Sequence, residues 1–363
     1  MNSFSRVTIN TANIRYNILQ FRDQLSAQTK IAAVIKSNAY GHGMVPMADF
    51  LEKNKLVDYL AVANDMEALT LRRQKIKLPL IVLSYWDENN LSQLATGNIE
   101  LAVYDLKQLR IISAFAAKNA NIFVKIHIKI DTGMHRLGLE PVDIFNFLDL
   151  IAKHENILLQ GLFSHLAVAD ERNKFTDIQI KEFYDIVAKI GKSVKLPLLH
   201  VANSAGSLHV PGGIPYMVRL GIAMYGLRPA ADFKILKLKP VLSWTTKVLQ
   251  VKKIAAGERL GYGLTYKFKK PSIIAVLAIG YADGYNRKLS NRGEVIIKQK
   301  KYPIRGRVCM NLTMVEVDGK VQSGDEAVLI GAGITADKLA DQAQTISYEI
   351  LAGINPEIQR IFQ

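Results

Sequence analysis

Short apolar runs recur along the first two thirds of the 363-residue chain, and amphipathic segments of helical length stand between most of them, as at 47–54, 105–119 and 176–191. Eight of the runs have strand length: 31–35, 59–63, 79–83, 100–104, 122–130, 158–163, 197–202 and 217–222. Strands that alternate with helices predict parallel βαβ units, and eight such units predict a (β/α)8 barrel of the TIM type. A doubly wound sheet is the alternative, but it usually has fewer strands, and no G-x-G-x-x-G follows the first run.

The pattern changes after about residue 230. Apolar, strand-like segments now follow one another across Gly, Asp and Pro turns, and the one helical segment is short: the strands are at 242–254, 272–285, 293–317 and 325–330, and the helix at 335–343. This pattern predicts a separate, mostly β domain, so we expect a barrel domain over 1–230 and a β domain over 231–363, with the junction near 227–233. At the chain start, 5–10 predicts a strand outside the barrel set, and 12–26 predicts a helix.

Polar and reactive side chains follow the barrel strands where each strand ends. The first run stops at Lys36, and the later runs end at Lys129, Asp131, Ser164, His165, Asn203, Ser204 and Arg219. Each of these residues alone has an ordinary explanation, such as a solvated strand end or a hydrogen-bonded core histidine. Because functional sites of this fold lie at the carboxyl ends of the strands, the whole set predicts a site at one barrel mouth.

Two loops after the last strands, 202–206 and 219–226, are rich in small residues. Small residues let backbone N–H groups approach an anion, and barrels often bind phosphate at this position. A phosphate site opposite a strand-end lysine favours pyridoxal 5'-phosphate, with Lys36 as the residue that forms a Schiff base. That bond needs a neutral amine, and partial burial lowers a lysine pKa in that direction.

Composition excludes or disfavours several functional classes of protein. The net charge is +15, but the lysines are scattered and no aromatic-interleaved basic motif appears, so a basic surface is favoured over nucleic-acid binding. The single cysteine, Cys309, excludes an internal disulfide and a cysteine-cluster metal site, and we expect no metal. The first residues lack a signal-peptide layout and the apolar runs are too short to span a bilayer, so we expect a cytoplasmic protein without a membrane partner.

Nine segments also resemble, in order, the motifs of the alanine racemase family: AVIKSNAYGHG (33–43), KIDTGMHRLG (129–138), FSHLAVAD (163–170), HVANSAG (200–206), VRLGIAMYG (218–226), GYGLTY (261–266), GYADGYNR (280–287), GRVCMN (306–311) and TISYEIL (345–351). The resemblance covers nearly the whole chain, and nine ordered motifs are far more specific than any one of them.

The resemblance implies a homodimer with shared active sites. Lys36 would hold pyridoxal phosphate and act as the base on the D face, and Tyr262 of the partner subunit would act as the base on the L face. Arg219 would face the pyridine nitrogen, His165 would link Arg219 toward the tyrosine, and Arg136 would contact the cofactor phenolate and the substrate carboxylate. Racemisation needs a base on each face, which agrees with two bases of different type.

Further roles are implied in the same way. The resemblance places Asn203 among the cofactor-binding residues and assigns the phosphate to Tyr40, Ser204, Gly221, Ile222 and Tyr348. Met310 of the partner subunit would meet the substrate carboxylate, and Tyr281 of the partner subunit would narrow the entrance. The lysine that matches Lys129 is often carbamylated in the family. Asn311, where many members have aspartate, and His135, where a smaller residue is common, depart from the pattern.

We therefore expect an isomerase that interconverts L- and D-alanine and provides D-alanine for peptidoglycan. One alternative is a racemase with a broader preference or a preference for serine. A decarboxylase of the same architecture would carry an acidic residue in place of Arg219, and a non-enzymatic pyridoxal-phosphate carrier would resemble the barrel alone. A nucleic-acid binder, which would shift DNA in a salt-dependent way, is the weakest alternative.

Overall fold

The computed structural model describes residues 3–171, 173–191, 198–208, 216–230 and 236–363. The chain divides into two compact units. The barrel unit comprises Arg15–Ser37 and Val45–Leu238, and the β unit comprises Met1–Ile14, Asn38–Met44 and Lys239–Gln363. The predicted junction near 227–233 lies partly outside the described residues. Within the described part, no helix has the length and apolar character needed to cross a membrane.

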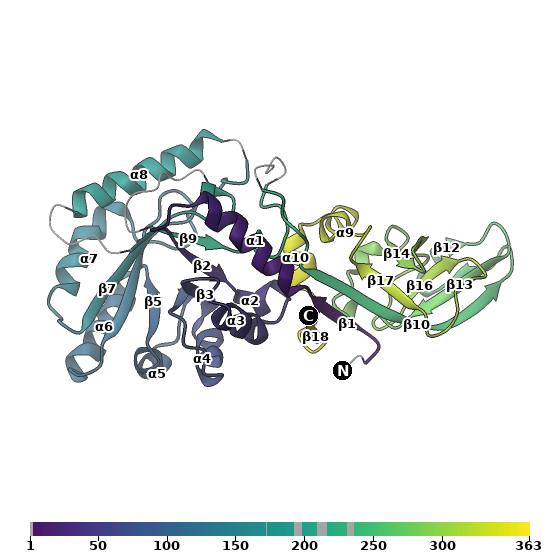
Figure 1. The fold of residues 1–363 in the computed structure, drawn as a ribbon, viewed down its shortest axis with the longest axis horizontal. Coiled ribbons are helices and arrows are strands. Elements are labelled where there is room, and N and C mark those ends of the chain that lie inside the picture. Colours follow the sequence, from purple (N-terminus) through teal and green to yellow (C-terminus); the bar gives the residue numbers. More distant parts are fainter. Residues whose placement is uncertain (1–2, 172, 192–197, 209–215, 231–235) are drawn as a thin grey trace. The chain divides into compact units, whose positions relative to one another are not determined.

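Eight parallel strands form the sheet of the barrel unit, in the spatial order β9-β2-β3-β4-β5-β6-β7-β8 (Figure 1). A parallel bridge between Leu199 and Tyr216 joins the two ends of this order, so the barrel is nearly closed. The strands are β2 (Lys30–Val34), β3 (Tyr59–Asn64), β4 (Leu80–Tyr85), β5 (Ile99–Val103), β6 (Val124–Lys129), β7 (Ile157–Phe163), β8 (Leu198–His200) and β9 (Met217–Leu220). All eight predicted strands and the TIM-type barrel are confirmed.

Helices separate these strands along the chain: α1 (Thr11–Gln24), α3 (Met44–Lys53), α4 (Asp65–Arg73), α5 (Leu91–Thr96), α6 (Leu106–Lys118), α7 (Ile144–Ile151) and α8 (Lys174–Ile190). Short 3-10 turns are η1 (Glu88–Asn90), η2 (Pro141–Asp143) and η3 (Gly206–Leu208). Asn64, Asp105 and Asn173 cap α4, α6 and α8, because each side chain accepts a hydrogen bond from a backbone N–H of the first turn.

The barrel strands are apolar because most of their side chains are buried, as Ile31, Ala32 and Ala33 are completely. The same strands also bury polar side chains: Glu100, His127, Lys129, His200 and Arg219 are each at most 6% exposed. Burying a polar group without a hydrogen-bond partner is costly, so these residues must bond one another or a ligand.

The β unit contains a sheet in the order β15-β14-β17-β10-β1-β18, with β13 and β16 attached through β10. Its strands are β1 (Arg6–Ile9), β10 (Leu242–Ile254), β13 (Ser272–Leu277), β14 (Glu294–Ile297), β15 (Lys300–Pro303), β16 (Thr313–Val317), β17 (Glu326–Ile330) and β18 (Gln359–Phe362), with a separate pair β11 (Arg259–Leu260) and β12 (Tyr266–Lys267). The predicted strand at the chain start is confirmed, since β1 pairs with β10 and β18.

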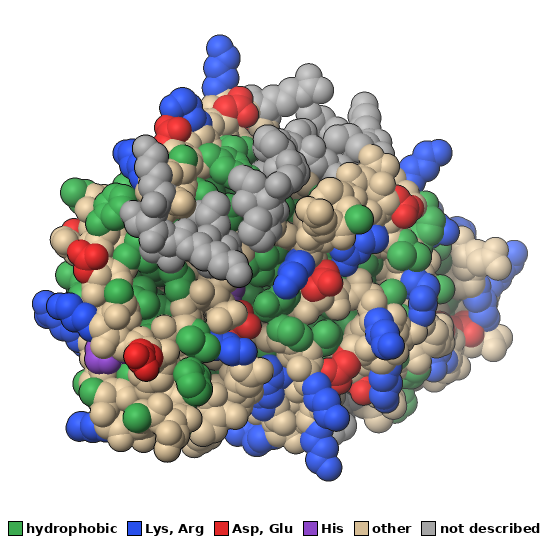
Figure 2. All heavy atoms as spheres, turned by 60° about the vertical axis from the view of Figure 1, so that its left-hand side comes forward, with side chains coloured by type: hydrophobic (Ala, Val, Ile, Leu, Met, Phe, Trp, Pro, Cys, Tyr) green, Lys and Arg blue, Asp and Glu red, His purple; other side chains and the backbone are tan. Residues whose placement is uncertain are grey.

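The helices of the β unit are short. They are α9 (Ala336–Ala343), as predicted, and α10 (Ser347–Ala352), with 3-10 turns η4 (Tyr262–Leu264), η5 (Tyr281–Asp283) and η6 (Arg287–Leu289). The predicted strand 272–285 ends at Leu277, because Gly280 begins η5 and Gly284 ends it in the left-handed region. On the face drawn in Figure 2, lysine and arginine side chains are spread among acidic ones and do not form one stripe.

Candidate active site

The carboxyl ends of the barrel strands bring the predicted polar residues to one edge of the sheet, the barrel mouth. Lys36 begins α2 (Lys36–Tyr40), with one residue between it and the end of β2, and Lys129 is the last residue of β6. His165 follows β7, Ser204 follows β8, and Arg219 lies in β9. The charges of Arg136, Arg219 and Lys36 all act on Lys129, which shows that these cations lie close together.

The segment after Lys36 has an unusual backbone. Ser37, Asn38, Ala39 and Tyr40 have φ values of 52° to 54°, so α2 is a left-handed turn. Left-handed helical conformation costs about 1–2 kcal/mol for each residue other than glycine, and such strain clusters at functional sites. This turn was not predicted, because among its four residues only Asn38 is of a type that often adopts positive φ, and the glycines that give the usual signal, Gly41 and Gly43, come after it.

Burial sets the charge of the two lysines in the mouth. Burial and the nearby Arg136 lower the pKa of Lys36, and the carboxylate of Glu67 opposes them. Burial, Arg136 and Arg219 lower the pKa of Lys129 to about 8. Both amines therefore lose their proton more easily than a solvated lysine, and the neutral amine is the nucleophile and the base.

Arg219 is held by a dense set of acceptors. Its guanidinium donates to the carbonyl oxygens of Ser164 (2.8 Å) and Val201 (3.2 Å), and to that of His200. It also donates to His200 Nδ1 (3.0 Å) and to His165 Nδ1 (3.2 Å). Burial lowers the pKa of Arg219 to about 10, so the side chain stays a cation at neutral pH.

A chain of buried imidazoles continues from Arg219 into the barrel. Arginine only donates, so His200 Nδ1 must accept and its proton must sit on Nε2. His200 Nε2 then donates to His127 Nδ1 (2.9 Å), and His127 Nε2 donates to the Glu100 carboxylate (2.6 Å). Burial, His127 and Arg219 hold the pKa of His200 well below its usual range, so His200 is neutral. We call Glu100, His127 and His200 the imidazole chain.

Two strand residues shape the space for the imidazole chain. Gly161 in β7 pairs with His127, and a Cβ at residue 161 would lie 2.0 Å from His127 Nδ1. Phe163 stacks on His200 with ring centroids 4.6 Å apart and an interplanar angle of 4°. The imidazole chain was not predicted from the sequence, although the glycine inside an apolar strand is a signal that another group approaches closely.

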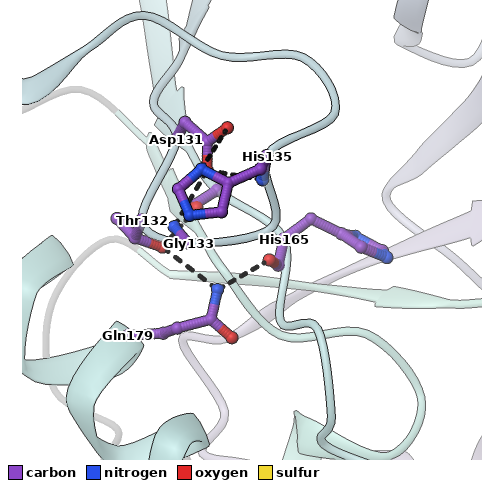
Figure 3. A network of polar contacts seen from close by, with 7 residues as sticks. Asp131, Thr132, Gly133, His135, His165 and Gln179 are labelled. Carbon is purple, nitrogen blue, oxygen red and sulfur yellow. Dashed lines mark hydrogen bonds and ion pairs between the residues drawn. The ribbon is translucent and has the colours of Figure 1, made fainter.

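The loop after β6 carries Arg136 and is tied down by Asp131 (Figure 3). The Asp131 carboxylate accepts the N–H groups of Gly133 (2.8 Å) and His135 (3.1 Å). The His135 side chain, one of the departures from the family pattern, is 83% exposed, and its Nδ1 lies 3.9 Å from Asp131 Oδ2. The histidine therefore lies at the surface of the loop.

Gln179 from α8 links this loop to the segment after β7 (Figure 3). Its amide donates to the His165 carbonyl (3.2 Å) and lies 3.5 Å from Thr132 Oγ1, and its oxygen accepts the Ala167 N–H (2.9 Å). Gln179 is completely buried. Burial and the charge of Arg219 lower the pKa of His165 to about 3, so this imidazole is neutral too.

The two small-residue loops meet through one hydroxyl. Ser204 Oγ accepts the N–H of Gly221 (2.9 Å), and Asn203 Oδ1 accepts the N–H of Gly206 (2.9 Å). Ile222, next to Gly221, is buried. Ser204, Gly221 and Ile222, which the resemblance assigns to phosphate, thus lie together in the barrel unit.

The remaining predicted residues lie in the β unit. Tyr40 and Tyr348 face each other with ring centroids 5.9 Å apart. Tyr262, Tyr281 and Met310 are 72%, 42% and 56% exposed. They line a surface cavity of about 470 Å³ together with Arg287, Arg307, Val308, Cys309, Asn311 and Leu312.

Two family models match consecutive parts of the chain. The model described as "Alanine racemase, N-terminal domain" matches residues 9–229, and the model described as "Alanine racemase, C-terminal domain" matches 241–362. "Alanine racemase 2" of Caldanaerobacter subterraneus subsp. tengcongensis is 38% identical over 369 residues, which cover 99% of this chain and 94% of the relative. The alanine racemase of Halothermothrix orenii is 37% identical, over 98% of this chain and 96% of its own length.

Solved structures agree with this likeness. An alanine racemase from Clostridium difficile 630 has a TM-score of 0.93 and 35% identity, over 99% of this chain and 96% of that structure. An alanine racemase from Bacillus anthracis with bound L-Ala-P has a TM-score of 0.92 and 33% identity, over 99% and 95%. The chain shares with these structures a TIM-type barrel with a strand-end lysine, followed by a mostly β domain, which is the architecture of a two-domain class of enzymes. Within that class, the chain belongs to the alanine racemase family.

Proposed function

We propose that this chain interconverts L-alanine and D-alanine with pyridoxal 5'-phosphate as its cofactor. The observation that carries the proposal is the barrel mouth itself. It combines a strand-end lysine of lowered pKa, Lys36, with a buried cation, Arg219, in a chain whose full-length relatives are named alanine racemases.

The residues of the barrel mouth fit an anionic cofactor and a carboxylate substrate. Lys36, Lys129, Arg136 and Arg219 gather there, while the carboxylates that act on these two lysines are Glu67 and Asp131. The excess of positive charge favours a phosphate and a carboxylate, and Gly221 and Ser204 offer small, polar contacts. When bound, pyridoxal phosphate withdraws electrons from the α-carbon of the amino acid that is joined to it.

Each catalytic role then falls to a named side chain. Lys36 would hold the cofactor, and its amine would take or return the α-proton on one face. Tyr262 of the partner subunit serves the opposite face, and Arg136 binds the substrate carboxylate. Arg219 stays protonated, so it would hold the pyridine nitrogen of the cofactor without giving it a proton, which would limit side reactions.

The same proposal includes a homodimer with shared active sites, in which 1–230 carries the cofactor and 231–363 serves the partner. Exposed aromatic and apolar side chains on one cavity of the β unit, Tyr262, Tyr281 and Met310, support a surface that a second copy covers. We assign Met310 and Tyr281 of the partner subunit to the substrate entrance, and Tyr40, Asn203 and Tyr348 to the cofactor.

We further propose that the product D-alanine serves peptidoglycan synthesis and that the chain acts in the cytoplasm, as the family resemblance and the single cysteine suggest. A broader or serine-preferring racemase is the alternative, and no contact among the described residues favours it. Arg219 opposes a decarboxylase, because the family resemblance implies an acidic residue at this position in such enzymes.

A chiral assay tests the function. Purified protein with added pyridoxal phosphate is incubated with a panel of single L-amino acids, and both enantiomers of each are measured over time. We expect L-alanine to approach an equal mixture fastest. Faster turnover of serine would overturn the substrate, and no racemisation of any amino acid would overturn the reaction.

A further inference from the structure

The carboxylate of Glu67 joins two backbone segments of the barrel mouth. Its Oε1 accepts the N–H of Ser37 (2.6 Å), and its Oε2 accepts the N–H of Ala63 (2.8 Å). Ser37 directly follows Lys36, and Ala63 lies in β3. Glu67 stands in the first turn of α4, where Asn64 Oδ1 accepts the Glu67 N–H (3.0 Å).

This arrangement differs from an ordinary helix start. In a capping box, a glutamate in the first turn bonds back to the N–H of the capping residue, which here is Asn64. The Glu67 carboxylate instead accepts the N–H of Ala63, the residue before Asn64. Its other oxygen accepts the N–H of Ser37, which lies in a different segment of the chain. The bond to Ser37 satisfies no N–H group of α4, so we assign its effect to the segment that begins at Lys36.

The segment that begins at Lys36 has a strained backbone, which further hydrogen bonds can stabilise. Ser37 has a φ of 52° and opens the left-handed turn, a conformation that carries strain for a residue with a side chain. A hydrogen bond to a carboxylate is stronger than one to a neutral acceptor, and it fixes the peptide plane between Lys36 and Ser37. The same plane anchors the backbone of Lys36, from which its side chain extends.

We propose that Glu67 is a positioning residue for Lys36, holding the left-handed turn through the Ser37 N–H. The proposal rests on the proposed function only in naming Lys36 as the cofactor lysine. Glu67 also adds a negative charge near Lys36 that opposes the lowering of its pKa by burial and Arg136. Lys129 and His165 face the same lysine, since its charge acts on both.

The chain offers a matched control in Glu52 of α3. Its carboxylate also accepts two backbone N–H groups of the barrel unit, those of Lys77 and Leu78 (2.6 Å each), just before β4. This site lies at the amino end of a strand, away from the carboxyl-end edge that carries the Lys36 segment. If carboxylates of this kind act only on stability, Glu52→Ala and Glu67→Ala must behave alike.

Hydrogen exchange on the full-length protein provides the first test, and it does not depend on activity. In Glu67→Ala we expect the Ser37 and Ala63 amides to exchange about tenfold to a hundredfold faster than in the unchanged protein. In Glu52→Ala these two amides should keep their rates, while Lys77 and Leu78 exchange faster. Unchanged Ser37 exchange in Glu67→Ala, or equal acceleration of Ser37 in Glu52→Ala, overturns the proposal.

Glu67→Gln removes the charge of the side chain but keeps its size. This variant provides a second test if Glu67→Ala does not fold. Its amide keeps one acceptor oxygen but turns a donor toward the other N–H, so one of the two amides should exchange about tenfold faster. Without the carboxylate charge, Lys36 should lose its proton at lower pH. The pH at which half of the protein has bonded pyridoxal phosphate at Lys36, measured by absorbance, should therefore be lower. A midpoint at the same or higher pH contradicts the electrostatic part. A protein that binds pyridoxal phosphate but racemises nothing overturns the proposed function and leaves the exchange result intact.

Discussion

At the scale of single residues, one donor-only side chain fixes the protons of two others. Arg219 can only donate, which forces His200 to accept at Nδ1 and His127 to donate to Glu100. The strand-end pattern in the sequence predicted the position of Arg219 at the barrel mouth. It could not predict the imidazole chain, because Glu100, His127 and His200 meet only after three strands come together.

Substituting Arg219 with glutamate should reverse the direction of the hydrogen bonds that join residue 219, His200 and His127. The introduced carboxylate needs a donor, so the His200 proton moves to Nδ1 and His127 must donate at both nitrogens, which makes His127 a cation between His200 and Glu100. Nitrogen NMR of labelled histidines should show a doubly protonated ring in Arg219→Glu. If Arg219 holds the pyridine nitrogen as proposed, racemisation should slow, with more keto-acid by-product, because an acid would then face that nitrogen.

Arg219→Lys is the control for that reversal. Lysine also only donates, so both neutral histidine tautomers should persist, whatever happens to the rate. A neutral His127 in Arg219→Glu would show that Arg219 does not set the protons of the imidazole chain.

Lys129 should titrate in an accessible range. Its pKa is lowered from 10.5 to about 8, so the folded chain holds the neutral amine from near pH 8 upward, whereas the unfolded chain still holds the proton up to its ordinary pKa. Between these two pKa values the unfolded state binds more protons than the folded state. The contribution of Lys129 to the free energy of unfolding therefore increases as pH rises through this range. Carbamylation needs the neutral amine, so the carbon dioxide adduct on Lys129 should increase from about pH 7 to about pH 9 in bicarbonate.

Mass spectrometry of intact protein and of peptides across this pH range measures the adduct. Lys125, which lies in the same strand, is the comparison within each sample. An adduct on Lys129 that does not change with pH, or one that Lys125 carries to the same extent, would contradict the prediction.

At the scale of elements, the sequence predicted every barrel strand because its β-branched apolar runs have strand length and alternate with helical segments, which is the pattern of parallel βαβ units. It did not predict the left-handed turn at Ser37–Tyr40, since only Asn38 is of a type that often adopts positive φ, and then as a single residue, while the Ser37 N–H is bonded by Glu67 from α4. Gly161 was predictable only in part. A glycine inside an apolar strand indicates that another group approaches closely, but the sequence does not show that this group is the His127 ring.

Gly161→Ala should distort β7 where it passes His127. The new methyl would overlap Nδ1 of His127, and overpacking of this kind costs about 1–3 kcal/mol. Urea unfolding should show this loss in the free energy of unfolding. Gly319→Ala is the control, because its methyl would meet only Ile273 at 3.9 Å. Equal stability of the two variants would mean that β7 yields without strain.

At the scale of the whole molecule, the proposed division of labour between subunits can be tested with two inactive variants. If Tyr262 of the partner subunit completes each site, Lys36→Ala and Tyr262→Phe homodimers should each be nearly inactive. In a mixed dimer, the barrel with intact Lys36 meets the chain with intact Tyr262, so one site is whole and the other lacks both bases. Tyr262 is 72% exposed in the single chain, as a residue that serves a partner should be.

Unfolding and refolding the two variants together at equal amounts should place about half of the dimers in the mixed form by random pairing. With one whole site in two, activity should recover to roughly a quarter of that of the unchanged protein. Dilution should reduce this activity, because a separated barrel lacks its second base. Mixed dimers that are demonstrably present but inactive would mean that Tyr262 acts within its own chain or not at all, since only a site built across two subunits can be restored by exchanging them.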